Sequence, residues 1–217
     1  MSLKSEIQGF DISGHSAAVI GCGGLGTNIA VHLAGAGIGR LLLIDYDRVE
    51  ARNLNRQYFY TGADVGEEKA RLLAARLQAY APETEIAYHA GAYEAALCDG
   101  YEIVLIAVDN LETRRAVNAD CAASGKPFVN GSINGFFGTA YLCIPGKTPD
   151  LSAAGCLDGA GIKNRSPSST AAIIGAYEAK LAIDYFLGHT QSAGLLYIYD
   201  NNEIRSLQIR RNDLDQL

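Results

Sequence analysis

Short apolar runs alternate with longer amphipathic stretches along the first part of the chain. Residues 17–21 and 41–45 are apolar runs that end in a glycine and in an acid, and a helical pattern covers residues 24–37 between them. Apolar runs of this length are typical of buried parallel strands. The three segments therefore predict a strand, helix, strand unit with a right-handed crossover.

The same kind of pattern continues to the end of the chain. Further helices are expected at residues 65–80, 113–124 and 170–187, and further strands at residues 85–89, 102–108, 128–133, 138–144, 195–199 and 204–210. The polar segment 48–62 is a candidate functional loop, and residues 148–169, rich in Gly, Ser, Pro and Asn, are expected to form a flexible crossover. We expect an α/β fold, a Rossmann-like open sheet with a parallel N-terminal half and a mixed or antiparallel C-terminal part. The whole chain, 1–217, is expected to be a single domain.

Composition narrows the class of protein. Apolar residues make up 48% and charged residues 19% of 217 positions, which excludes disordered and fibrous classes. The five cysteines include no CxxC pair, so no zinc site is expected, and the odd count favours a reducing cytoplasm over a secreted disulfide framework. No signal peptide and no apolar run of about 18 residues is found, so no membrane span is expected. A net charge of −6 argues against broad nucleic-acid binding.

A glycine-rich loop lies between the first strand and the first helix. Gly21, Gly23, Gly24, Leu25 and Gly26 belong to the sequence G-C-G-G-L-G, which fits G-x-G-x-x-G. Glycines there permit a tight turn and let a phosphate approach the helix N-terminus. The alternative is a tight turn without a ligand.

Two acids follow the second strand. Asp45 ends that strand, 19 residues beyond Gly26, where a carboxylate suits hydrogen bonds to a ribose diol. Asp47 either touches the ligand or caps the next turn. The glycine loop and Asp45 together predict nucleotide binding.

Two cations come next along the chain. Arg56 stands in the sequence N-L-N-R-Q together with Asn53 and Gln57, and Lys69 follows at the start of the next helix. Two positive charges near one nucleotide suit a triphosphate better than a dinucleotide, because phosphoryl or nucleotidyl transfer needs its charge neutralised. For Lys69 the alternative is a solvated helix face, with ion pairs to the neighbouring Glu67 or Glu68.

Asp109 and Asn110 follow the most apolar strand. Open α/β sheets bind ligands at the carboxyl ends of their strands, and one carboxylate together with phosphate oxygens is a usual way to hold Mg²⁺. Asp109 is therefore the candidate magnesium ligand. The alternative is that this pair caps the helix that follows.

Together these motifs resemble the ThiF/MoeB/HesA family, the prokaryotic relatives of ubiquitin-activating enzymes. The resemblance runs through G-C-G-G-L-G, L-L-L-I-D-Y-D-R-V-E, N-L-N-R-Q, V-G-E-E-K and A-V-D-N, closely over residues 16–110 and more loosely over residues 171–187. It implies an adenylyltransferase that uses ATP and Mg²⁺ to convert a carboxylate into an acyl-adenylate with release of pyrophosphate. In many members the acid is the C-terminal glycine of a ubiquitin-like sulfur carrier protein, in thiamine or molybdopterin type sulfur transfer. The family also forms homodimers.

The resemblance assigns roles to single residues. Asp45 matches the ribose acid, and Asp109 matches the magnesium aspartate. The phosphate-contacting positions correspond to Asn53, Arg56 and Lys69, and Gln57, Asp47 and Asn110 also fall within the matching motifs. These roles are implied by the resemblance to the family.

Cys156 stands apart from the other cysteines. It lies in a segment that is similar to the family's crossover, which carries a cysteine in members that transfer sulfur or form thioesters. A cysteine in such a loop could accept the acyl group, and Lys163 and Arg165 could lower its pKa. The alternative is an inert loop cysteine. The remaining ones, Cys22, Cys98, Cys121 and Cys143, are interpreted as packing residues.

The chain departs from the family pattern in three ways. The two CxxC pairs that bind zinc in many members are absent, no arginine precedes Arg40, and no rhodanese-like extension follows. The acid that is activated therefore stays open: a small-molecule acid or a tRNA-attached carboxylate remains an alternative to the carrier. From other classes, an NAD-dependent oxidoreductase and a non-catalytic nucleotide-binding module also remain. Arg114 and Arg115, near the start of a predicted helix, are expected to face solvent rather than a carrier tail.

Overall fold

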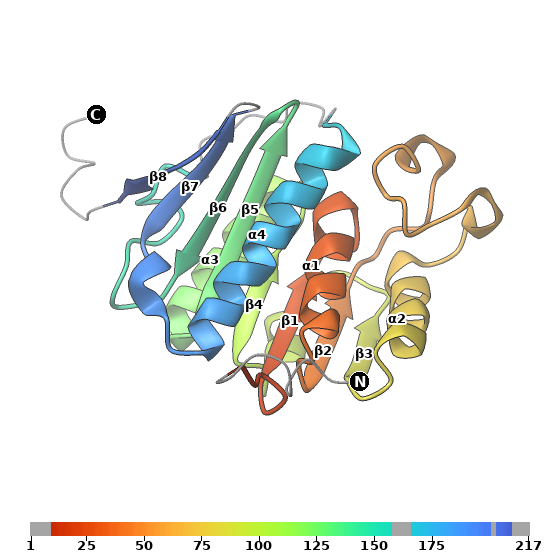
Figure 1. Cartoon of the computed structure of the whole chain (residues 1–217), viewed down its shortest axis with the longest axis horizontal. Helices are drawn as coiled ribbons and strands as arrows, with labels where there is room; N and C mark the ends of the chain where they lie inside the picture. The colour runs from red at the N-terminus through yellow and green to blue at the C-terminus, as the bar shows by residue number, and fades with distance from the viewer. Residues whose placement is uncertain (1–9, 158–165, 201–202, 210–217) are drawn as a thin grey trace.

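A computed structural model describes residues 10–157, 166–200 and 203–209 of the chain. Its centre is one eight-stranded sheet with the order β3-β2-β1-β4-β5-β6-β7-β8 (Figure 1). Strands β1 to β5 are parallel, and β6, β7 and β8 each run antiparallel to the preceding strand. The strands are β1 Ser16–Ile20, β2 Arg40–Ile44, β3 Glu85–His89, β4 Ile103–Ile106, β5 Phe128–Asn134, β6 Phe137–Cys143, β7 Leu195–Asp200 and β8 Ile204–Gln208. The predicted open sheet with a parallel N-terminal half and an antiparallel C-terminal part is confirmed.

Helices cover both faces of the sheet. Helices α1 (Gly24–Gly35), α2 (Lys69–Tyr80) and α4 (Ser168–Phe186) lie on one face, and α3 (Leu111–Ser124) lies on the other (Figure 1). The central strands β1 and β4 are buried at every position because both of their faces are covered. This explains why these strands appear in the sequence as continuous apolar runs rather than as alternating patterns. No helix in the described ranges is both long enough and apolar enough to cross a membrane.

Two hydrophobic clusters fill the space between the sheet and its helices. On the α1, α2 and α4 side the cluster includes Ile29, Leu73 and Leu181, and on the α3 side it includes Val117 and Phe128. The second cluster also contains Cys98, Cys121 and Cys143, whose thiols have pKa values raised by burial. Their interpretation as packing residues is therefore confirmed.

The start of α2 differs from the sequence-based expectation. The predicted helix at 65–80 begins at Lys69, because Gly66 takes a positive φ of 95° and the chain just before the helix pairs with an earlier segment. The backbone amides of Val49 and Lys69 donate to the carbonyls of Glu67 and Asp47. The expected loop at 48–62 contains short 3-10 helices at Ala51–Asn53 and, at its end, Gly62–Asp64.

Helix α4 lies across the N-terminal half of α1. A Cβ atom at Gly175 would come within 2.7 Å of the Cβ of Asn28 and 2.8 Å of the carbonyl oxygen of Leu25, so a glycine is needed for this close approach. The expected crossover at 148–169 is described over residues 148–157 and 166–169, and α4 already begins within it, at Ser168. Its first part is tied to α3 by a hydrogen bond from the Leu151 amide to Asn118. Residues 158–165, including Lys163 and Arg165, lie outside the described residues.

Candidate functional site

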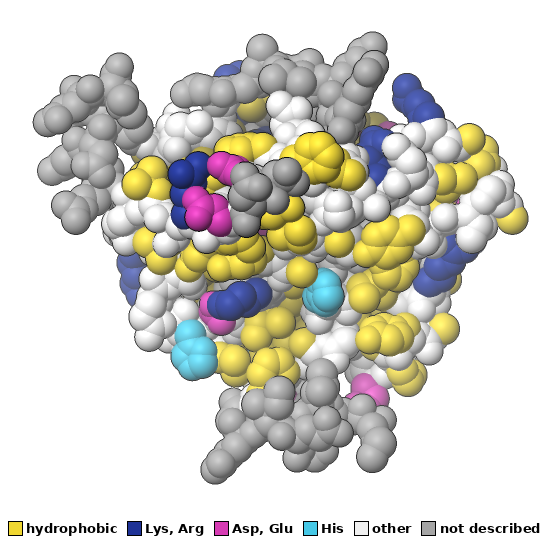
Figure 2. Space-filling view, turned by 45° about the horizontal axis from the view of Figure 1, so that its top comes forward, with side chains coloured by type: hydrophobic (Ala, Val, Ile, Leu, Met, Phe, Trp, Pro, Cys, Tyr) yellow, Lys and Arg dark blue, Asp and Glu magenta, His cyan; other side chains and the backbone are white. Residues whose placement is uncertain are grey.

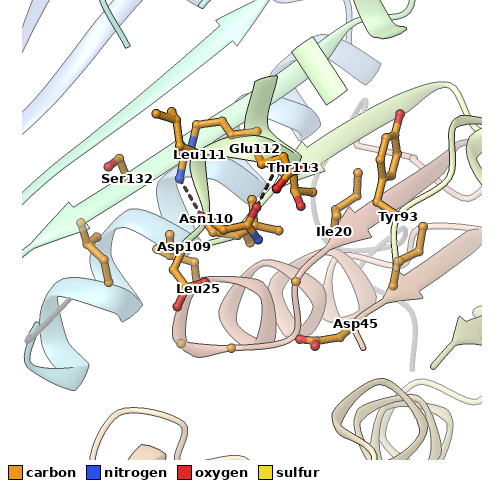
Figure 3. Close-up of a pocket in the computed structure, with 18 of the residues that line it drawn as sticks. Ile20, Leu25, Asp45, Tyr93, Asp109, Asn110, Leu111, Glu112, Thr113 and Ser132 are labelled. Carbon is orange, nitrogen blue, oxygen red and sulfur yellow. Dashed lines mark hydrogen bonds between the residues drawn. The ribbon is translucent and has the colours of Figure 1, made fainter. Parts of the chain in front are cut away.

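A cavity of about 1000 Å³ opens at the carboxyl ends of β1, β2 and β4. The strand order places β2 on one side of β1 and β4 on the other, so the chain reverses its direction of winding at this point. Ligands of open α/β sheets bind at such switch points. The lining contains most of the predicted site residues, namely Gly21, Gly23, Gly24, Leu25, Asp45, Asp47, Arg56, Gln57, Lys69, Asp109, Asn110 and Cys156. Figure 3 labels Leu25, Asp45, Asp109 and Asn110 among them.

The glycine loop brings β1 and α1 unusually close together. A Cβ atom at Gly26 would lie 1.7 Å from the carbonyl oxygen of Gly21, and one at Gly21, whose φ is 96°, would lie 2.6 Å from the carbonyl oxygen of Ala107. Gly26 therefore serves helix–strand packing and does not line the cavity. The first turn of α1 has no side-chain cap and no acidic residue. Its free backbone amides, next to Gly23 and Gly24 in the cavity wall, suit an anion.

Asp45 is fixed against this loop. Its Oδ2 accepts a hydrogen bond of 2.6 Å from the Cys22 amide, and its Oδ1 accepts one of 2.7 Å from the Asp47 amide. Burial raises the pKa of Asp45, whereas these hydrogen bonds and Lys69 lower it. Cys22 is fully buried, and its pKa is raised well above the ordinary value by burial, which agrees with a packing role. Figure 3 shows Asp45 and Asp109 on either side of the glycine loop.

Lys69 is buried and paired with an acid far away in sequence. Its side chain is 3% exposed, and its Nζ lies 2.9 Å from Oδ2 of Asp47, which is 50% exposed. The alternative of ion pairs with Glu67 or Glu68 is wrong, since in the described structure those acids pair with Arg71 and, for Glu68, also with Arg48. Asp47 therefore orients the Lys69 ammonium within the cavity wall.

Arg56 and Gln57 approach the cavity from the loop after β2. Arg56 is half-buried, and its guanidinium donates to Oδ1 of Asn53 at 3.4 Å. The carbonyl of Asn53 accepts from the amides of both Arg56 and Gln57, so Asn53 supports the loop from outside the cavity lining. Gln57 is buried, and its Oε1 has no hydrogen-bond partner among the described residues. A buried polar atom without a partner next to a cavity fits a site built for a polar ligand.

Asp109 and Asn110 have different structural roles. Asn110 is the N-cap of α3, and its Oδ1 accepts a 2.7 Å hydrogen bond from the Thr113 amide (Figure 3). The helix-cap alternative thus holds for Asn110, although this residue also borders the cavity. Asp109 is exposed and keeps its carboxylate in the cavity. Within the described ranges no three acidic, histidine or cysteine side chains gather as a metal site, so Mg²⁺ here would depend on Asp109 and ligand oxygens.

Comparison with known proteins decides the family. The sequence model of the ThiF family matches residues 9–216. The chain belongs to the ThiF family. The family resemblance expected from the motifs is thus confirmed.

Named relatives of this ThiF-family chain are adenylyltransferases, which confirms the predicted enzyme class. The chain is 35% identical to the sulfur carrier protein adenylyltransferase of Thermus thermophilus over 223 residues, covering 91% of this chain and 79% of the relative. It is 35% identical to the adenylyltransferase and sulfurtransferase MOCS3 of Mus musculus, covering 91% of this chain and 46% of the relative. The chain therefore spans about half the length of such MOCS3 relatives.

A solved structure agrees in fold. Escherichia coli MccB with ATP superimposes with a TM-score of 0.81 at 22% identity, covering 94% of this chain and 66% of that chain. At this identity the likeness concerns the Rossmann-like architecture alone.

Cys156 borders the cavity of this ThiF-family protein. It is half-buried, and its Sγ donates to the carbonyl of Ala154 at 3.5 Å. The two cations expected to act on it, Lys163 and Arg165, lie outside the described residues. Among the described residues, Arg114 interacts electrostatically with Cys156.

The expectation that Arg114 faces solvent is wrong. Its side chain is 8% exposed and bonds to Val108, Asn130 and Gly131, whereas Arg115 is exposed as expected. Sequence periodicity could have identified this residue. Positions 114, 117, 118 and 121 are the buried face of α3 and follow the i, i+3, i+4, i+7 pattern of a helix.

Proposed function

We propose that this protein binds ATP with Mg²⁺ in the cavity and adenylates the C-terminal carboxylate of a small ubiquitin-like sulfur carrier protein. The observation that carries this proposal is the single cavity that joins the glycine loop, Arg56, Lys69 and Asp109. It continues past Asp109 along β5 to β7, where Ser132, Thr139 and Leu196 line it. One half therefore suits a nucleotide and the other suits an acid.

The first half offers a donor set for a nucleoside triphosphate. The free amides at the start of α1 and the side chains of Arg56 and Lys69 would bind phosphate oxygens. Asp45, fixed beside the loop, would accept hydrogen bonds from the ribose. Asp47 and Asn53 would act through the cations that they hold, and Gln57 would use its unpartnered oxygen to orient the ligand.

The proposed reaction is displacement at the α-phosphate. An oxygen of the substrate carboxylate attacks phosphorus, the new P–O bond forms, and the bond to pyrophosphate breaks, so that the pyrophosphate leaves with the negative charge. Arg56 and Lys69 stabilise that charge where it develops, which is a main source of catalysis in such sites. Mg²⁺ held by Asp109 would supply further charge neutralisation.

The carrier is the substrate that best fits the relatives and the cavity. The relative from Thermus thermophilus is named for a sulfur carrier protein, and it shares 35% identity over most of both chains. The β5–β7 side of the cavity, lined by Ser132, Thr139 and Leu196, would receive the glycine tail of the carrier.

Several further properties belong to the same proposal. Cys156 would attack the acyl carbonyl as a thiolate, so that a C–S bond forms and the C–O bond to AMP breaks.

The whole chain would act as one adenylation domain and form a homodimer, which light scattering can test. All five cysteines are free thiols in the structure, which supports a reducing cytoplasm as the site of action.

Pyrophosphate exchange into ATP tests the function. The wild-type protein is expected to catalyse exchange with a ubiquitin-like carrier ending in Gly-Gly, and not with the same carrier lacking its last glycine. Arg56→Ala and Asp109→Ala should reduce exchange at least about 100-fold, since each removes charge stabilisation in the transition state. The matched control is Arg52→Ala, an exposed arginine outside the cavity. Exchange that depends on a small acid instead of the carrier, or survives in both cavity variants, would contradict the proposal.

A further inference from the structure

Strands β4 and β5 separate beside the cavity, which is lined by Ala107 and Val108 after β4 and by Ser132 and Ile133 of β5. The parallel pairing of β4 with β5 ends at Ile106 and Asn130. Beyond this pair, β4 leads through Val108 to Asp109, while β5 continues to Asn134 in its pairing with β6. Backbone hydrogen bonds between β4 and β5 therefore do not fix the distance between Asp109 and the β5 residues beyond Asn130.

Arg114 bridges this gap. One guanidinium nitrogen, Nη2, donates to the carbonyl of Val108 at 2.7 Å. The other, Nη1, donates to the carbonyl of Gly131 at 2.9 Å and to Oδ1 of Asn130. A single side chain thus bonds to Val108, two residues beyond the end of β4 and one before Asp109, and to β5 at the point where the strands separate.

The surroundings of Arg114 make this bridge stiff. The side chain is buried, and no carboxylate within the described ranges forms an ion pair with it, so its hydrogen bonds go to backbone and amide oxygens. Hydrogen bonds from a charged, planar guanidinium are stronger than neutral ones and fix direction as well as distance. Gly131 is also held from the opposite face of the sheet. The carboxylate of Glu178 on α4 packs so tightly there that a Cβ at Gly131 would lie 2.1 Å from its Oε2.

We propose that Arg114 is a positioning residue that sets the separation between Asp109 and the β5 side of the cavity by tying the end of β4 to β5. This inference rests on the proposed function, because the nucleotide half of the cavity lies on the β4 side and the acid half on the β5 side. Reacting atoms must approach to about 3–3.5 Å, and a displacement of about 1 Å can cost about 100-fold in rate. Loss of the bridge therefore acts on the reaction step rather than on binding of the nucleotide.

The test compares substitutions at two neighbouring arginines. Arg114→Gln removes the bridge, Arg114→Lys keeps the charge without the planar fork, and Arg115→Gln is the matched control on the exposed side of α3. Pyrophosphate exchange with the Gly-Gly carrier gives kcat, and calorimetry with a non-hydrolysable ATP analogue and Mg²⁺ gives the nucleotide Kd. We expect Arg114→Gln to lower kcat about 100-fold and Arg114→Lys about 10-fold, with Kd within about threefold of wild type. Arg115→Gln should leave both quantities within about twofold.

Several results would overturn the inference. These are an Arg114→Gln variant that behaves like Arg115→Gln, a Kd that worsens in parallel with kcat, and loss of folding by circular dichroism in both Arg114 variants. Crystal structures of the wild type and of Arg114→Gln distinguish a failure of this inference from a failure of the proposed function, because the structures can be determined without any substrate. The segment of Val108 and Asp109 should move relative to β5 in Arg114→Gln, and an unchanged separation would refute the positioning role whichever acid the enzyme accepts. A wild-type protein that binds the analogue but exchanges pyrophosphate with no acid would instead refute the proposed function.

Discussion

The ion pair between Asp47 and Lys69 gives a sharp prediction about stability and ligand affinity. Replacing Asp47 by Asn removes the only carboxylate that pairs with Lys69 in the described structure, and leaves an ammonium that is 3% exposed. Removing one partner of a fully buried pair costs about 3–5 kcal/mol, whereas exposed pairs are worth about 0–1 kcal/mol. Because Asp47 is 50% exposed, we expect an intermediate loss of about 2 kcal/mol in the free energy of unfolding, measured in urea without nucleotide.

The same substitution should strengthen nucleotide binding. If Lys69 binds phosphate as proposed, the Asp47 carboxylate would compete with phosphate oxygens for the Lys69 ammonium, since both would lie within hydrogen-bond distance of Nζ. In Asp47→Asn the phosphates supply the missing counter-charge. A non-hydrolysable ATP analogue should then bind about fivefold more tightly, which corresponds to about 1 kcal/mol. Calorimetry measures this affinity, and unfolding with saturating analogue should show that part of the lost stability is recovered.

Glu50→Gln is the matched control for this experiment. Glu50 pairs with Arg52 at the surface, and both side chains are well exposed. Its removal should change the free energy of unfolding by less than about 0.5 kcal/mol and leave nucleotide affinity unchanged. The reasoning would be refuted if Asp47→Asn were as stable as the control. Weaker binding of the analogue in Asp47→Asn would refute the expected competition and show that Asp47 contributes to nucleotide binding, through the orientation of Lys69 or by direct contact.

Three further predictions concern a buried acid, a close contact and the cavity thiol. Burial raises the pKa of Glu178 well above its ordinary 4.5, so the wild type should lose stability as the pH rises above about 4.5. In Glu178→Gln this loss should be absent, so the variant should be the more stable protein at pH 8. If the free energy of unfolding in urea depended on pH equally in the two proteins, this prediction would be contradicted. Gly26→Ala should cost about 3 kcal/mol because its Cβ would lie 1.7 Å from the Gly21 carbonyl oxygen, whereas Gly62→Ala, with free space around it, should change stability by less than about 0.5 kcal/mol. Cys156→Ser should keep pyrophosphate exchange within about twofold yet abolish any thioester or persulfide trapped on the protein; loss of exchange would place this cysteine in the adenylation step.

The parallel half of the fold and the glycine loop could be predicted because their signals are local. A strand buried on both faces needs a continuous apolar run, and the turn after β1 needs glycine where a Cβ would meet the backbone. The cap at Asn110 follows from equally local rules, because an Asn before a helix accepts from an amide three residues later. The cap stood only as the alternative to a ligand role for this pair, and the start of α2 at Lys69 was missed, so a local signal predicts an element more securely than the role or the boundary of a single residue.

Long-range pairing decided the features that the sequence pattern did not predict. Lys69 has glutamates directly before it, which favours a surface ion pair, but the pairing of the chain before α2 with residues 47–49 turns it into the cavity wall beside Asp47. Arg114 likewise stands beside a second arginine, Arg115, and two residues after Glu112, and only its place on the buried face of α3 brings it to Val108 and Gly131. In both cases a cation is buried next to the cavity with oxygen partners supplied by another segment. Such a cation must be paired or bonded to be stable there, so the same contacts that bury it also fix its direction. Precise placement of charge in this site is thus a property of the tertiary fold, which is why substitutions at the oxygen partners test the site as directly as substitutions at the cations themselves.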